Sequence, residues 1–188
     1  MLEGIYHWPV LPALPPQGRF VLICLRTGRP RAEARKEVRT LLRRLLASWT
    51  GLSPEMVPLQ ETPSGPVWQG EPHERLLDFS LSYIKDEAWV AVRRGGIIGL
   101  DAMRLEPVPE AEAMAQTYFD PADRAKLRES SDSVRGFALA WTQLEARCKC
   151  LKRGLTEWSE YVALETKACT TESLILQDSL ALSIATIG

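Results

Sequence analysis

The segment Trp141–Lys149 carries an acid and a base at a spacing that could support chemistry. Phe137, Trp141, Glu145 and Lys149 follow one another at intervals of four residues. On an α-helix this spacing puts two aromatic rings, a carboxylate and an ammonium group on one face. Such a face could hold a metal-bound phosphate. The same pattern also fits an amphipathic core helix in which Glu145 and Lys149 form an ordinary ion pair.

A second acid follows a short apolar segment upstream of this helix. Ile97–Leu100 reads as a buried strand that delivers Asp101 at its end. A carboxylate at the end of a strand can face a cleft. With Asp101 added, the helical acid and base favour a ligand site over core packing alone.

These two segments together resemble the Sfp-type 4'-phosphopantetheinyl transferases. That superfamily has a strand ending in Gly-Ile-Asp-x-Glu and a helix reading Trp-Ser/Thr-x-Lys-Glu-Ala-x-x-Lys, with Gly-Leu shortly after it. The corresponding residues here are Gly99-Leu100-Asp101, Trp141–Lys149 and Gly154-Leu155.

Further similarities occur in the family's order. Arg39–Leu42 resembles an Arg-x-Leu-Leu helix, and Phe79–Ser82 resembles the Phe-Asn-x-Ser-His-Ser segment. Tyr118-Phe119 resembles the Phe-Phe pair that precedes the catalytic helix. The joint order of the motifs, over roughly residues 20 to 188, identifies the chain as a divergent member.

The resemblance implies an α+β fold of two pseudo-twofold-related α/β subdomains. We expect an N-terminal subdomain over residues 1–98 and a C-terminal subdomain over residues 99–188, which carries most of the metal and catalytic residues. A helix and an antiparallel strand set occur in each half, although no sequence repeat proves the symmetry independently.

The implied reaction is transfer of the 4'-phosphopantetheine arm from coenzyme A, the co-substrate, to a serine of an acyl or peptidyl carrier protein. We expect Asp101 and Glu145 to bind Mg²⁺. Glu145 would accept the serine proton, and Lys149 would bind a phosphate oxygen. We expect Trp141 to pack in an interdomain core.

The resemblance also implies contacts to coenzyme A. Arg39 matches the arginine that contacts its 3'-phosphate. The alternative is that Arg39 belongs to a solvated arginine face of the helix expected over residues 31–49. Ser82 and Tyr83 occupy the Ser-His positions of the Ser-His-Ser segment, and Lys149 would contact the cofactor as well.

Several positions depart from the family pattern. Met103 stands where the family has its second acid, and a thioether is a poor ligand for magnesium, so water would take that position. Tyr83 replaces a histidine, Leu144 replaces a lysine, and Ser64-Gly65-Pro66 lacks the lysine of Gly-Lys-Pro. Two alternatives therefore stay open: a degenerate member that binds coenzyme A or a carrier protein without transfer, and a partner-binding protein on the same scaffold.

Composition indicates a folded protein with a substantial core. The chain has 188 residues, 45% of them hydrophobic, and a formal net charge of −1. This balance gives no general basis for binding nucleic acid or a membrane, and prolines interrupt the apolar N-terminal run. The four cysteines show neither metal-ligand nor disulfide spacing, so we expect reduced thiols in a cytoplasmic protein. Two complementary halves in one chain favour a monomer.

Hydrophobic periodicity predicts the elements that position these residues. We expect helices over residues 31–49, 111–118, 121–128 and 132–152, with Asp120 as an N-cap. We expect strands over residues 20–25, 77–81, 88–92, 97–100, 160–165, 174–177 and 180–185. Residues 51–74 read as a long loop with one short strand near 57–60, and His7 and His73 as ordinary surface residues.

Overall fold

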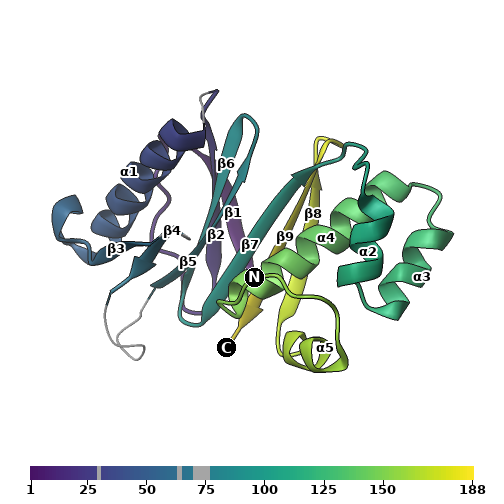
Figure 1. Cartoon of the computed structure of the whole chain (residues 1–188). Coiled ribbons are helices and arrows are strands. Elements are labelled where there is room, and N and C mark those ends of the chain that lie inside the picture. Colours follow the sequence, from purple (N-terminus) through teal and green to yellow (C-terminus); the bar gives the residue numbers. More distant parts are fainter. Residues whose placement is uncertain (29–30, 63–64, 70–76) are drawn as a thin grey trace. The chain divides into compact units, whose positions relative to one another are not determined.

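Strands and helices follow one another in separate runs along the chain, which folds into two structural units (Figure 1). Unit 1 comprises Met1–Ile97 with Gly188, and unit 2 comprises Ile98–Ile187. The computed structural model describes residues 1–28, 31–62, 65–69 and 77–188. Each unit combines helices with a sheet, which confirms the α+β class.

Unit 1 is built on a four-stranded sheet with the order β1-β2-β6-β5. Its strands are β1 (Leu2–His7), β2 (Phe20–Arg26), β5 (Leu77–Ile84) and β6 (Glu87–Arg94). β1 pairs with β2 in parallel, and the other pairs are antiparallel. The apolar run of β2 is buried throughout Phe20–Leu25, as a central strand requires.

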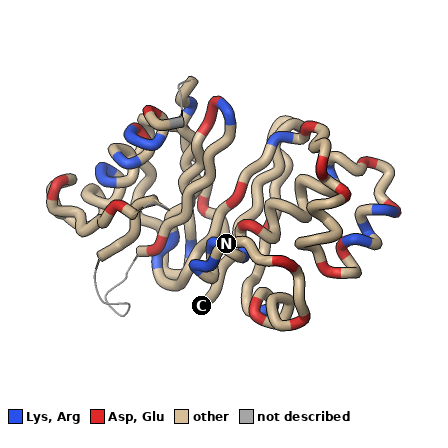
Figure 2. The backbone as a smooth tube through the Cα atoms, viewed as in Figure 1, with Lys and Arg blue, Asp and Glu red and all other residues tan. Residues whose placement is uncertain are grey.

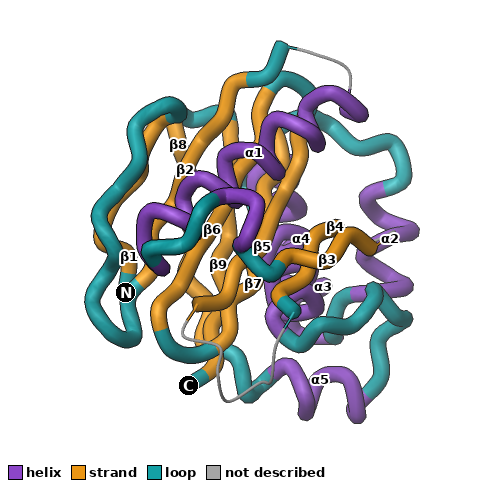
Figure 3. The backbone as a smooth tube through the Cα atoms, turned by 90° about the vertical axis from the view of Figure 1, so that its left-hand side faces the viewer, coloured by secondary structure: helices purple, strands orange, loops and turns teal. Residues whose placement is uncertain are grey.

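Helix α1 (Arg31–Thr50) lies across one face of this sheet (Figure 3). Its apolar residues recur with helical spacing and are completely buried against the strands. They are Val38, Leu41, Leu42, Leu45 and Leu46. The basic residues expected from the sequence lie along the rest of the helix (Figure 2).

The segment after α1 contains more structure than the sequence predicted. A short 3₁₀ turn at Pro54–Met56 leads into a hairpin of β3 (Leu59–Thr62) and β4 (Gly65–Trp68). The expected single strand near 57–60 is therefore the first of two, and it begins at the buried Leu59. Ser64 and His73, which the sequence singled out, lie outside the described residues.

Unit 2 contains a three-stranded sheet with the order β7-β9-β8. Its strands are β7 (Ile97–Arg104), β8 (Thr170–Leu176) and β9 (Leu180–Ile187). The long helix α4 (Ser133–Cys150) packs on β9 and β8, and α2 (Ala111–Tyr118) and α3 (Pro121–Glu129) precede it.

Two of these helices begin at aspartate N-caps. The Asp120 side chain accepts a hydrogen bond of 2.8 Å from the Asp123 amide, which confirms the predicted cap of α3. The Asp132 side chain likewise accepts from the Arg135 amide at the start of α4. Both caps satisfy amides that have no partner within their helix.

One predicted element has the wrong type. Residues 160–165 were expected as a strand, but Glu160–Thr166 forms the short helix α5. The Ser159 hydroxyl caps it by accepting from the Val162 amide at 3.2 Å. Val162 and Thr166, four residues apart, are its buried positions, so the periodicity is helical.

Two further expectations concern membranes and cysteines. In the part of the chain that the structure describes, no helix has the length and apolar character needed to cross a membrane. None of the four cysteines forms a disulfide.

Candidate active site

Strand β7 and helix α4 approach each other closely at Gly99. A Cβ atom on this residue would lie 2.0 Å from the Ala146 carbonyl oxygen and 2.4 Å from the Cys150 amide nitrogen. Neither atom can move without moving the helix backbone, so only glycine fits. Asp101 lies two residues further along the strand, and alternate residues share a face, so its side chain also faces α4.

Asp101 and Lys149 form an ion pair in this contact. The Lys149 Nζ lies 2.7 Å from Asp101 Oδ1 and donates a second hydrogen bond of 3.1 Å to the Leu100 carbonyl. Asp101 is buried, with 8% of its surface exposed, whereas Lys149 is half-buried. The lysine is therefore held at the end of its side chain by two acceptors from β7.

Glu145 belongs to the same cluster. Burial raises the pKa of its carboxyl, the Asp101 carboxylate raises it further, and the Lys149 ammonium acts in the opposite direction. The structure thus brings Asp101, Glu145 and Lys149 together in unit 2. A carboxylate with a raised pKa is a stronger base than an ordinary carboxylate.

The donors in this cluster fit a magnesium ion. Mg²⁺ prefers oxygen ligands and takes one or two protein carboxylates, with water and phosphate oxygens completing its shell. Asp101 and Glu145 supply two carboxylates. Among the described residues, no group of three or more histidine, cysteine or acidic side chains is placed to bind a metal ion.

Met103 and Trp141 lie in an aromatic cluster of unit 2. Trp141 stacks on Phe137 with ring centroids 5.9 Å apart and meets Tyr118 edge-on at 5.8 Å. Met103 packs against the same cluster. Trp141 therefore packs within unit 2, where it supports the α4 face that carries Glu145.

Leu144, at the position of the family's lysine, lies on another side of α4 from Glu145. It lines a cavity of about 160 Å³ together with Phe119, Trp158 and Val162. Residues 144 and 145 are adjacent on a helix and point about 100° apart, so a side chain at 144 faces elsewhere than Glu145. The loss of a lysine here leaves the contact between Asp101 and Lys149 untouched.

A buried polar ladder, which the sequence did not reveal, fixes α4 to the sheet. The Ser183 hydroxyl on β9 lies 2.8 Å from the Thr142 hydroxyl and 2.9 Å from the Ser173 hydroxyl. Gln143 donates to Ser173 at 3.0 Å. Since unpaired polar groups in a core are costly, this ladder favours one register of the helix over others. Serines in apolar strands are the only sequence signal for it.

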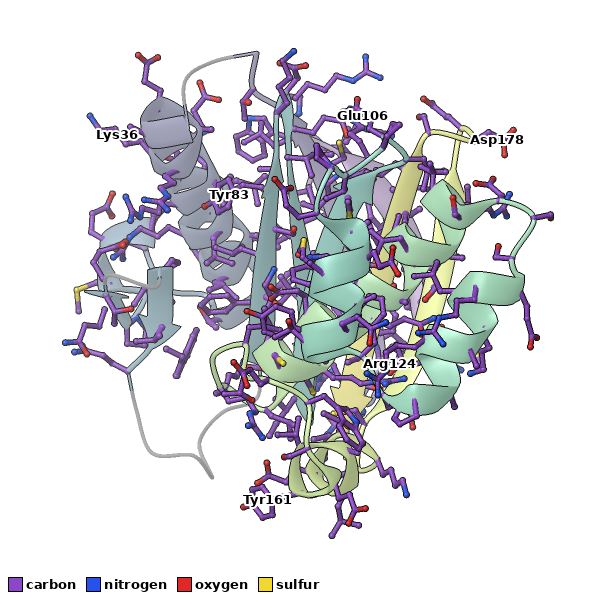
Figure 4. The ribbon with its side chains drawn as sticks, turned by 45° about the vertical axis from the view of Figure 1, so that its right-hand side comes forward. Lys36, Tyr83, Glu106, Arg124, Tyr161 and Asp178 are labelled. Carbon is purple, nitrogen blue, oxygen red and sulfur yellow. The ribbon has the colours of Figure 1, made fainter. Side chains whose placement is uncertain are left out.

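The three residues of unit 1 expected to contact coenzyme A lie on two elements. Arg39 lies on α1, while Ser82 and Tyr83 are neighbours on β5. Tyr83 packs in the core beside α1 (Figure 4). Because successive strand residues face opposite ways, Ser82 lies on the other face of the sheet, where it is buried.

Comparison with known proteins gives two findings. A family model described as the 4'-phosphopantetheinyl transferase superfamily matches residues 97–183, which include Asp101, Glu145 and Lys149. The chain is also 30% identical over 149 residues to the 4'-phosphopantetheinyl transferase HetI of Nostoc sp. strain PCC 7120. That similarity covers 78% of this chain, and the chain spans 62% of the length of the relative.

Substituting Gly99→Ala is expected to destabilise the protein by about 3 kcal/mol, because the added methyl group meets helix backbone that cannot yield. Gly154→Ala is the matched control: a Cβ there meets nothing within 4 Å, so the free energy of unfolding should change by less than about 0.5 kcal/mol. Urea denaturation of both variants measures the difference, and equal stabilities would refute the close contact.

Glu145→Gln is expected to stabilise the metal-free protein at pH 8. The raised pKa means that folding disfavours the ionised carboxylate. The Glu145 carboxyl contributes fully to the free energy of unfolding below the ordinary carboxyl pKa. This contribution is lost as the pH rises through the folded-state pKa. Thermal melts with a chelator should therefore show a higher melting temperature for Glu145→Gln than for the unsubstituted protein, and this difference should grow from pH 4 to pH 8. The exposed Glu129→Gln is the control, and a gain independent of pH would argue against a buried charge.

Proposed function

The chain belongs to the 4'-phosphopantetheinyl transferase superfamily, and we propose that it transfers the 4'-phosphopantetheine arm of coenzyme A to a serine of an acyl or peptidyl carrier protein. The observation that carries this proposal is the cluster in unit 2. There Lys149 lies 2.7 Å from the Asp101 carboxylate, and the charges of both residues shift the pKa of Glu145. Two acids and one lysine are the groups that attack on a pyrophosphate requires.

In this proposal Asp101 and Glu145 hold a magnesium ion. The bound ion would neutralise charge that develops on the pyrophosphate oxygens. Two carboxylates suffice for a cation that retains water, so Met103 at the family's second acidic position does not prevent binding.

Glu145 and Lys149 perform the remaining chemistry. The serine hydroxyl of the carrier attacks the pantetheine-linked phosphorus, and the bond from that phosphorus to the bridging oxygen breaks, which releases adenosine 3',5'-bisphosphate. Glu145 accepts the serine proton, directly or through a water. Lys149 donates to a phosphate oxygen and offsets its charge.

Coenzyme A would also contact unit 1. We assign Arg39 to the 3'-phosphate, because a guanidinium binds phosphate oxygens through paired hydrogen bonds. Ser82 and Tyr83 are the proposed contacts on β5. Since their side chains point to opposite faces of the sheet, only one of them would touch the ligand by its side chain, and the other would contribute backbone atoms.

A second candidate function is binding of coenzyme A or a carrier protein without transfer. The placement of Met103 favours it, because this side chain packs against aromatic rings and offers no oxygen to a metal. Magnesium-independent binding of coenzyme A with no loading of a carrier would support this candidate over the transferase.

The remaining features of the proposed enzyme follow from the sequence. We propose residues 1–98 and 99–188 as its functional subdomains, and a monomer as its working state. We also propose a cytoplasmic location, as expected from the cysteine spacing in the sequence.

A loading assay tests the transferase proposal. The protein is incubated with coenzyme A, Mg²⁺ and a panel of apo carrier proteins, and intact-protein mass spectrometry detects the added phosphopantetheine. We expect a mass gain that a chelator abolishes. Asp101→Asn and Glu145→Gln should each lower the rate by about 100-fold or more, because each removes a charge from the reacting centre.

Asp178→Asn is the matched control, because this residue is exposed in the turn between β8 and β9 (Figure 4), whereas Asp101 lies within β7. Its rate should equal that of the unsubstituted protein. Loading that survives in both Asp101→Asn and Glu145→Gln would contradict the assignment of the site.

A further inference from the structure

Arg39 is already engaged by an acid of its own unit. The Arg39 Nε lies 2.7 Å from Glu61 Oε2, and the two side chains are 33% and 46% exposed. The Nε atom itself is buried, and within the described part of the chain it makes no hydrogen bond, because its N–H bond does not point at the carboxylate oxygen. The contact is thus an attraction of charges that leaves a hydrogen-bond donor of the guanidinium unused.

Arg43, one helical turn further along α1, holds the segment that delivers Glu61. Its guanidinium donates to the carbonyl oxygens of Val57 at 3.0 Å and Leu59 at 3.1 Å. Leu59 starts strand β3, so Glu61 lies two residues beyond an anchored carbonyl. Glu61 is therefore positioned over Arg39 by the backbone and is not a freely moving surface acid.

The β3–β4 hairpin adds a second constraint on this acid. Glu61 pairs with Pro66 across the hairpin, and the Thr62 hydroxyl donates to the Gly65 carbonyl at 2.7 Å. Gly65-Pro66 is the remnant of the motif in which the family has a lysine. In this chain the hairpin has glycine at the lysine position of the motif, and it places the Glu61 carboxylate beside the arginine assigned to a phosphate.

We propose that Glu61 is a specificity residue that competes with the 3'-phosphate of coenzyme A for Arg39. This inference rests on the proposed function, because it takes Arg39 as the 3'-phosphate contact. A carboxylate and a phosphate monoester are both anions that pair with guanidinium, and they repel each other at one site. Binding of the 3'-phosphate requires Glu61 to move away, so the protein discriminates weakly between coenzyme A and 3'-dephospho-coenzyme A.

The strength of the ion pair is compatible with this exchange. Pairs between partly exposed side chains contribute little to stability, because water screens their attraction. A phosphate can offer several charge-assisted hydrogen bonds, including one to the unused Nε donor. Displacement of Glu61 therefore lowers the affinity for coenzyme A without unfolding the hairpin, which Arg43 holds independently.

Calorimetry with two ligands tests the proposal on the full chain. Coenzyme A and 3'-dephospho-coenzyme A are titrated into the unsubstituted protein and into Glu61→Gln at low ionic strength. We expect Glu61→Gln to bind coenzyme A about 3-fold to 10-fold more tightly, while the affinity for 3'-dephospho-coenzyme A changes by less than about 2-fold. The gain should shrink as salt is added, because the repulsion it removes is screened.

Two further variants complete the design. Glu55→Gln makes the same charge change at an exposed position on the same segment, and neither affinity should respond to it. Arg39→Gln should weaken coenzyme A binding and abolish the difference between the two ligands. Thermal melts of all variants establish that the fold is retained.

The possible results distinguish a failure of this inference from a failure of the proposed function. If Arg39→Gln weakens coenzyme A binding but Glu61→Gln leaves it unchanged, Arg39 keeps its assignment and the competition by Glu61 is refuted. If Glu61→Gln tightens both ligands equally, it acts on something other than the 3'-phosphate, and the inference is also refuted. If Arg39→Gln has no effect, or the unsubstituted protein binds no coenzyme A, the phosphate assignment fails and the inference falls with it.

Discussion

The closeness of two backbones at Gly99 is the constraint on which the candidate site depends. A strand and a helix normally keep a distance set by the side chains between them. Here the strand residue has no side chain, so the Ala146 carbonyl and the Cys150 amide lie where a Cβ atom would be. The next residue on that face, Asp101, then reaches Lys149 at hydrogen-bond distance. With any larger residue at 99, the acid would be carried away from the helix.

The rest of unit 2 keeps the helix in the register that this contact needs. The Ser183 hydroxyl ties α4 to the sheet through Thr142, and the aromatic cluster around Phe137 and Trp141 packs beside it. These interactions have no direct chemical role. They fix the rotation of α4 about its axis, so that Glu145 and Lys149 face β7. Charges of both signs therefore lie close together in a partly buried cluster. Such pre-organised charge is what stabilises a developing anion most effectively.

Local patterns in the sequence predicted most of the fold, and long-range contacts account for what they missed. The helix at 133–150 follows from apolar spacing, and the helix at 121–129 from the Asp120 cap followed by proline, which are local signals. The strand expected at 160–165 is a helix, because the Ser159 cap and two buried positions outweigh the strand propensity of a short apolar run. Strand β1 was missed, since its partner β2 lies beyond a proline-rich segment. Family motifs predicted Asp101, Glu145 and Lys149 as site residues, but no sequence pattern predicts that Glu61 pairs with Arg39 from another element.

We propose that Asp101 and Glu145 bind the metal ion that faces the pyrophosphate of coenzyme A. Anomalous scattering from crystals grown with Mn²⁺ and coenzyme A measures this directly, because manganese accepts the same oxygen ligands as magnesium. We expect one anomalous peak within coordination distance of both carboxylates and of a pyrophosphate oxygen, with Lys149 on a phosphate. A pyrophosphate bound without a metal at these two acids, or a peak at other residues, would contradict it.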